Sequence, residues 1–86
     1  MNVRFKVMTM NQDIGEILVF KTNLRSQDHV AIVAPRLNTH PGIRKWNVDC
    51  HDVDCVLRIV SDAELSPEEI IRLVRESGFS CEELSD

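Results

Sequence analysis

Residues 46–59 of the chain read Trp-Asn-Val-Asp-Cys-His-Asp-Val-Asp-Cys-Val-Leu-Arg-Ile. If 51–54 form a four-residue loop, the flanking residues pair as Trp46 with Ile59, Val48 with Leu57 and Cys50 with Cys55. Successive side chains of a strand point to opposite faces, so these six side chains share one face. Because one register accounts for the whole apolar set, the stretch predicts a two-stranded antiparallel hairpin.

The residues before the hairpin predict a strand and a helix. The stretch from Glu16 to Thr22 is rich in branched and aromatic residues, which favour strands. Its apolar run at 17–20 does not alternate, so we expect side chains on both faces to be covered. Ser26 is typical of the residue that caps a helix N-terminus. Apolar residues then recur at helical spacing and predict a buried stripe at Val30, Val33, Ala34 and Leu37.

The residues after the hairpin predict a second helix and a last strand. Ser66 is a typical N-cap, Pro67 suits the first helical position, and Glu69 completes the pattern of a capping box. Gly78 is placed to end this helix in the left-handed conformation. The residues at 79–83 can form a short strand.

From Glu16 onward the expected order is strand, helix, strand, strand, helix, strand. This order predicts the α+β class and a ferredoxin-like βαββαβ fold, with an antiparallel sheet and two helices on one face. We expect the 86 residues to form a single domain with its core at 14–83. Residues 1–13 are interpreted as an N-terminal extension with an extra strand, because apolar residues alternate at Val3, Phe5 and Val7.

The composition argues against several classes of protein. Hydrophobic residues at 43% and charged residues at 28% are ordinary globular values. The net charge is -4, and no basic stripe is interleaved with aromatic residues, so we expect no nucleic-acid partner. No apolar run approaches the roughly 18 residues of a membrane span. Three cysteines without a signal-peptide core predict reduced thiols and a cytoplasmic location.

Taken together, these motifs resemble the heavy-metal-associated domain of copper chaperones and metal-transporting ATPases. In that family a Met-x-Cys-x-x-Cys loop opens the first helix, and a Pro-Gly-Val-like step follows it. A Val-Asp-Leu-like segment lies in the hairpin, and a Gly before an aromatic residue ends the second helix. The corresponding stretches here are Pro-Gly-Ile at 41–43, Val-Asp-Cys at 48–50, Ser-Pro-Glu-Glu at 66–69 and Ser-Gly-Phe at 77–79. The resemblance covers about 16–83.

The two cysteines of the family motif are missing. Counted back without gaps from Gly42, the family's methionine falls on Leu24 and its cysteines fall on Ser26 and His29. In the family, two thiolates bind a soft ion such as Cu(I), whereas a serine hydroxyl is a poor ligand for such an ion. One imidazole does not make a site. The resemblance therefore implies a metal-carrier fold, while these residues predict a degenerate metal site.

A second cluster of metal-ligand residue types lies at 50–55, which reads Cys-His-Asp-Val-Asp-Cys. Cys50, His51 and Cys55 could bind zinc or copper at the hairpin tip. The hairpin register instead predicts that both cysteines pack on the buried face. A redox-active cross-strand pair is a third interpretation. We expect no metal site. If the chain does bind a metal ion, the candidate ligands are Cys50, His51, Cys55 and His29.

The sequence predicts neither catalytic residues nor a cofactor. No histidine is placed beside Cys81 to act as its base. Acylphosphatases share the strand order, but the Gly-rich phosphate-binding loop that they need is missing.

The sheet face without helices is expected to carry apolar residues from 17–20 together with Val56 and Val60. Exposed apolar patches usually mark interaction surfaces. We therefore predict a non-enzymatic protein-interaction or regulatory domain that binds a second copy or another protein through this face. The alternative is a copper- or zinc-binding or metal-transport protein with a non-standard Cys/His site. A small-ligand regulatory domain of the same topology is a third hypothesis.

Overall fold

A computed structural model of the chain describes residues 16–62 and 65–84. Its elements are β1 (Glu16–Thr22), α1 (Gln27–Asn38), β2 (Ile43–Asp49), β3 (Val56–Ser61), α2 (Pro67–Glu76) and β4 (Cys81–Glu83). This is the βαββαβ order that the sequence predicts. The extra strand expected at 1–13 lies outside the described residues.

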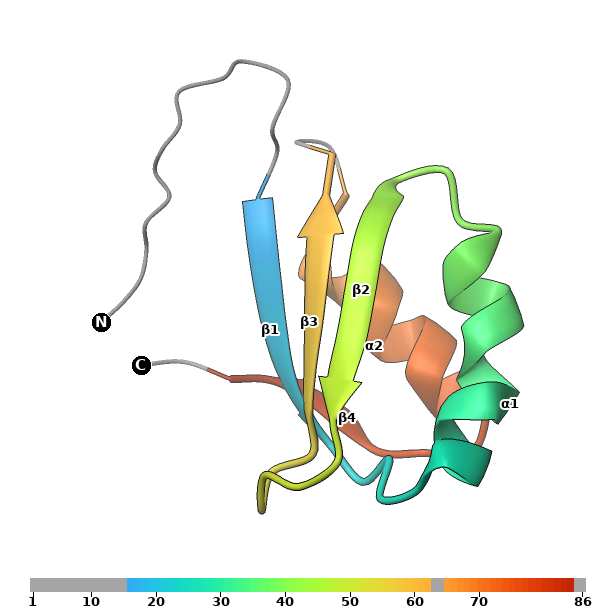
Figure 1. The fold of residues 1–86 in the computed structure, drawn as a ribbon. Coiled ribbons are helices and arrows are strands. Elements are labelled where there is room, and N and C mark those ends of the chain that lie inside the picture. The colour runs from blue at the N-terminus through green and yellow to red at the C-terminus, as the bar shows by residue number, and fades with distance from the viewer. Residues whose placement is uncertain (1–15, 63–64, 85–86) are drawn as a thin grey trace.

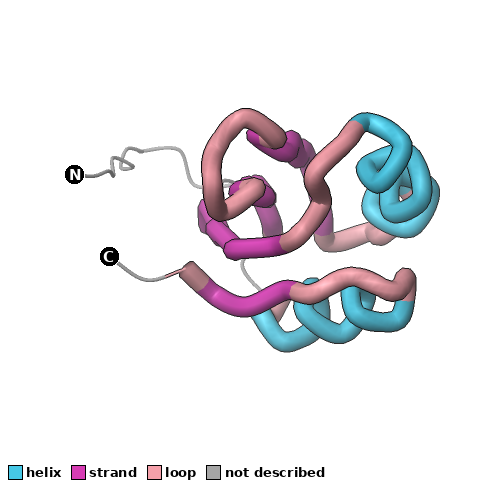
Figure 2. The backbone as a smooth tube through the Cα atoms, turned by 90° about the horizontal axis from the view of Figure 1, so that it is seen from below, coloured by secondary structure: helices cyan, strands magenta, loops and turns pink. Residues whose placement is uncertain are grey.

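The four strands form one antiparallel sheet in the order β2-β3-β1-β4. In Figure 1 α2 lies behind the strands and α1 lies beside β2, to its right. Buried residues of both helices join one core with the same side of the strands, so the other face of the sheet has no helix on it. Seen from below, the helices (cyan) lie to one side of the strands (magenta) (Figure 2). The α+β, ferredoxin-like fold is therefore confirmed. No helix in the described part of the chain is long and apolar enough to cross a membrane.

The core lies between the sheet and the two helices. The strands contribute Phe20, Leu57 and Ile59, which are all fully buried. Each helix contributes two fully buried residues one turn apart, and these are Val33 and Leu37 from α1 and Ile70 and Val74 from α2. The apolar stripe predicted for α1 thus faces the sheet, because burying that stripe is what stabilises an amphipathic helix.

The hairpin register is confirmed for two of its three predicted pairs, Trp46 with Ile59 and Val48 with Leu57. The pairing of β2 with β3 ends at Asp49 and Val56, so the third pair, Cys50 with Cys55, is not formed. The prediction of a four-residue loop was wrong, because the turn takes six residues, 50–55. The physical reason is the φ of 45° at Cys55, which takes the backbone out of the extended conformation.

The predicted cap of α1 is confirmed, because the backbone N–H of His29 donates to Ser26 Oγ at 3.2 Å. The capping box predicted for α2 was wrong. Ser66 makes no side-chain cap hydrogen bond. The carboxylate of Glu69 instead lies 3.2 Å from His40 Nε2, so a partner from the turn after α1 replaces the local one.

The end of α2 follows the sequence prediction. Gly78 has a φ of 99°, the left-handed conformation expected for the residue after a helix. The final strand is shorter than the predicted 79–83, since pairing with β1 includes only Cys81–Glu83.

We call the sheet surface without helices the open face. Side-chain alternation and the strand registers assign to it Ile17, Val19 and Lys21 of β1, Val56, Arg58 and Val60 of β3, Lys45, Asn47 and Asp49 of β2, and Glu82 with Leu84 at the β4 end. Ile17 is 56% exposed, and Val19 and Val60 are half-buried. Val56 is only 4% exposed, so the apolar patch is smaller than the sequence predicts.

Candidate functional site

The β1–α1 loop contains Leu24, Ser26 and His29, the residues that the sequence resemblance aligns with the metal-binding motif of heavy-metal-associated domains. Leu24 is fully buried in the core. Ser26 Oγ accepts the backbone N–H of His29 at 3.2 Å. His29 Nδ1 in turn accepts the backbone N–H of Arg25 at 3.1 Å. The His29 ring packs against Phe79 with 5.0 Å between ring centroids and a tilt of 47°. Side chains therefore satisfy backbone donors throughout this loop.

These hydrogen bonds determine what the loop can do chemically. A neutral imidazole has one N–H and one acceptor nitrogen. Because His29 Nδ1 is the acceptor, the ring hydrogen lies on Nε2, and neither nitrogen offers a free lone pair to a metal. Ser26 Oγ already accepts a hydrogen bond and is a poor ligand for a soft ion. Both side chains at the motif positions thus act as loop and helix caps.

The candidate ligands of the hairpin turn are placed in different environments. Cys50 is half-buried, and its Sγ lies 4.0 Å from Gln27 Nε2. His51 is exposed, while Cys55 is buried and its carbonyl accepts the Thr22 hydroxyl at 2.6 Å. Within 16–62 and 65–84, no three His, Cys, Asp or Glu side chains lie together so that they could hold a metal ion.

The turn nevertheless lies at the same end of the molecule as the motif loop. The contact of Cys50 with Gln27 joins it to the first residue of α1, and the Thr22 N–H donates to the Asp54 carbonyl at 3.0 Å. Figure 1 shows the β2–β3 turn and the start of α1 at the lower end of the sheet. The fold therefore brings two separate sequence motifs, the loop at 24–29 and the turn at 50–55, to one end.

The third thiol, Cys81, lies opposite Thr22 in the β1–β4 pairing and is 3% exposed. Burial raises the pKa of this thiol to about 12, against a smaller opposing effect of the nearby Arg75. A thiolate is the nucleophilic and metal-binding form of cysteine. Cys81 is protonated at neutral pH and is a packing residue.

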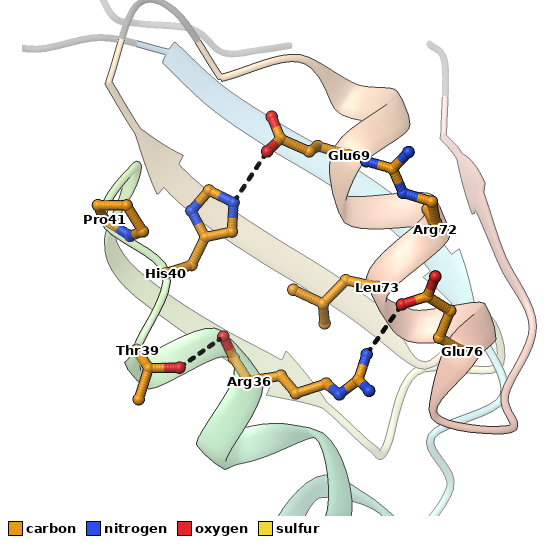
Figure 3. Close-up of a pocket in the computed structure, with 8 residues that line it drawn as sticks. All are labelled: Arg36, Thr39, His40, Pro41, Glu69, Arg72, Leu73 and Glu76. Atoms are coloured by element: carbon orange, nitrogen blue, oxygen red, sulfur yellow. Dashed lines mark hydrogen bonds and ion pairs between the residues drawn. The ribbon is translucent and has the colours of Figure 1, made fainter.

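A groove that the sequence does not indicate lies between the end of α1 and α2, with a volume of about 360 Å³. Two pairs cross it, Arg36 with Glu76 at 3.1 Å and His40 with Glu69 at 3.2 Å, and Leu73 lies between them (Figure 3). No short-range spacing connects residues 29 or 40 positions apart in the sequence, so no local pattern could have revealed these pairs.

Comparison with known proteins finds no matching family model and no matching curated protein. Solved structures do match. The yeast copper transporter domain Ccc2a, solved in apo and Cu(I)-loaded states, is 18% identical with a TM-score of 0.69, over 81% of this chain and 96% of that one. The apo HMA domain of the copper chaperone for superoxide dismutase is 15% identical with a TM-score of 0.65, over 99% and 85% of the two chains.

A further match comes from the structure of the Atx1–Cu(I)–Ccc2a complex, at 18% identity and a TM-score of 0.69 over 81% of this chain and 96% of the matched chain. Sequence identities this low establish a common fold and nothing finer. The chain thus has the ferredoxin-like fold of copper transporter and copper chaperone HMA domains.

Proposed function

We propose that this chain is a non-enzymatic protein-interaction domain of the heavy-metal-associated type, in which the metal motif has become a structural cap. One observation carries the proposal. The side chains at the two motif positions, Ser26 and His29, both accept hydrogen bonds from backbone N–H groups at 3.1–3.2 Å. Their acceptor atoms stabilise the loop, so they are not available as ligands.

Two further observations support a role in protein contacts. A structure with the same fold has been solved as a complex of Atx1, Cu(I) and Ccc2a. In this chain the open face carries exposed and half-buried aliphatic side chains at Ile17, Val19 and Val60. Such a surface fits a protein partner better than it fits a small substrate. We place the domain in the cytoplasm, where its three cysteines stay reduced.

Metal titration of the reduced full chain tests the degenerate site. Cu(I) is titrated under anaerobic conditions in competition with bathocuproine disulfonate, and Zn(II) in competition with a chromophoric zinc chelator. We expect the wild-type chain to form no stoichiometric complex with either ion. The double variant Ser26→Cys/His29→Cys should gain one Cu(I) site, because paired thiolates at these positions supply the soft ligands that the wild type lacks.

The matched control is Cys50→Ser/Cys55→Ser, which should titrate like the wild type. Stoichiometric binding by the wild type that this control abolishes would overturn the proposal in favour of a metal-binding protein with a Cys/His site at the turn. Binding that is lost in His29→Ala would overturn it in favour of a metal site in the motif loop.

A further inference from the structure

Arg58 lies at the centre of the open face. The strand registers place Asn47 on one side of it, in β2, and Val19 on the other side, in β1. Along β3 its neighbours on the same face are Val56 and Val60. The Arg58 side chain is exposed and forms no ion pair with a described residue. A charged guanidinium is therefore surrounded mainly by aliphatic side chains.

The charges around Arg58 make the open face more cationic than the chain as a whole. Lys45 on β2 is exposed, and Lys21 on β1 lies 3.9 Å from Asp54 at the hairpin turn. The carboxylates of the face, Asp49 and Glu82, lie at the hairpin-turn end, where Lys21 is the cross-strand partner of Glu82. Arg58 and Lys45 form no ion pair with a described carboxylate, on a chain whose net charge is -4. A partner with negative charge is favoured here.

The edges of the sheet are poor sites for adding a strand. The edge strand β4 has only three residues, and two of them are the exposed Glu82 and Glu83. The other edge strand, β2, has an irregular pairing between Ile43 and Lys45 and exposes the charged side chains of this region. Short, charged and irregular edges are the features that prevent edge-to-edge association. The open face is therefore a better binding surface than either edge of the sheet.

A second copy of the chain fits this face poorly. A two-fold interface brings the same patch of both copies together. With the two-fold axis across the strands, Arg58 of one copy faces Arg58 of the other. With the axis along the strands, Asp49 of one copy faces Glu82 of the other. The first arrangement buries two like charges at its centre, which is costly in an interface, although it also brings Asp49 opposite Lys45. The second brings two carboxylates together at the sheet edges.

We propose that the open face binds a segment of another protein that presents a carboxylate between aliphatic side chains. The carboxylate pairs with the Arg58 guanidinium, whose fork of N–H donors matches its two oxygens. The flanking aliphatic side chains pack on Ile17, Val19 and Val60. Arginine is enriched in the centre of protein interfaces, where a buried charge pair contributes to specificity. This inference rests on the proposed function, because it names the chemistry of the protein partner.

Selection from a phage-displayed library of random peptides tests the proposal with the full chain as the target. The enriched peptides should carry Asp or Glu beside Leu, Ile or Val. A synthetic copy of the enriched peptide should bind Arg58→Glu about tenfold more weakly or worse than the wild type. Arg72→Glu is the matched control, since Arg72 is an exposed arginine on α2 and the change in net charge is the same. That variant should bind like the wild type.

The apolar part of the surface has its own matched pair of variants. Ile17 on the open face and Ile32 on α1 are 56% and 55% exposed. Ile17→Ser should weaken binding of the selected peptide, and Ile32→Ser should leave it unchanged. A peptide with Lys in place of its acidic residue should prefer Arg58→Glu over the wild type, because the charge pair is then reversed.

Several results would overturn the inference. The inference fails if no peptide is enriched, or if the enriched peptides lack an acidic residue. It also fails if Arg58→Glu and Arg72→Glu lose equal affinity for the selected peptide. A concentration-dependent dimer in sedimentation velocity would instead assign the face to a second copy. Protection of Ile17 from carbene footprinting in the monomer would assign it to another part of the same chain. The copper titration tests a different claim. Cu(I) binding by the wild type contradicts the proposed function, whereas peptides that bind wild type and Arg58→Glu equally contradict only this inference.

Discussion

The Nε2 atom of His40 lies 3.2 Å from the Oε2 atom of Glu69, which links the turn after α1 to the first turn of α2. On the other side of the ring, Nδ1 accepts the backbone N–H of Gly42 at 3.0 Å. Because Nδ1 is an acceptor, the ring hydrogen lies on Nε2 and is donated to the carboxylate. One half-buried imidazole therefore holds a backbone turn and a helix together.

Replacing His40 should destabilise the fold more than changing Glu69. His40→Ala removes both hydrogen bonds and leaves the Gly42 N–H without its acceptor, so we expect a loss of about 1–3 kcal/mol in the free energy of unfolding. Glu69→Gln keeps an acceptor oxygen for Nε2–H and should cost less than about 1 kcal/mol. Urea unfolding measures both variants. Equal losses would show that the Gly42 hydrogen bond contributes nothing.

The two helix caps should respond differently to alanine. Ser26→Ala removes the hydrogen bond to the His29 N–H and should cost about 1 kcal/mol of unfolding free energy. Ser66 caps α2 without a side-chain hydrogen bond, so Ser66→Ala should change stability by less than about 0.5 kcal/mol. The urea midpoint at constant m-value reports each change. A larger effect at Ser66 would contradict the difference between these caps.

Substitutions at Gly78 measure the cost of backbone strain alone, because no neighbouring atom overlaps with an added Cβ. A Cβ added at Gly78 meets no heavy atom within 4 Å, yet the φ of 99° is unfavourable for residues with side chains. Gly78→Ala should therefore cost about 1–2 kcal/mol, all of it conformational. Gly78→Asn should cost less, because asparagine adopts left-handed conformations more readily. Thermal unfolding of the two variants compares them, and a more stable alanine variant would be inconsistent with the left-handed turn.

The buried thiol of Cys81 should make stability fall in alkaline solution. Burial raises the pKa of this thiol from 9.0 to about 12 in the folded chain, whereas unfolding restores the ordinary value. Between these two values the unfolded state releases a proton that the folded state keeps. The contribution of Cys81 is therefore complete below the unfolded pKa and decreases as the pH rises toward the folded pKa.

Urea unfolding at about pH 8 and about pH 10 measures this linkage. Cys81→Ala is the reference, because it keeps every other titrating group. The stability difference between the wild type and this variant should shrink at the higher pH. A difference independent of pH would mean that the thiol is not desolvated in the folded state.

The register of the hairpin was predictable, and its turn was not. The pairs of Trp46 with Ile59 and Val48 with Leu57 follow from the two-residue period of a strand, which the sequence displays directly. The turn depends on contacts with β1, where the Thr22 N–H donates to the Asp54 carbonyl and the Thr22 hydroxyl to the Cys55 carbonyl. Thr22 is more than thirty residues away, and no local pattern encodes that contact.

The sequence by itself determined the order of the elements and the caps at Ser26 and Gly78. These properties depend on neighbouring residues and on short periods. Only the tertiary structure decided that His29 Nδ1 is occupied by a backbone N–H, that Glu69 binds His40 in place of its own helix cap, and that Arg58 is at the centre of the open face. The physical reason is that hydrogen bonds and charge patterns in a folded chain depend on which groups compete for each partner, and strand pairing and helix packing bring those groups together.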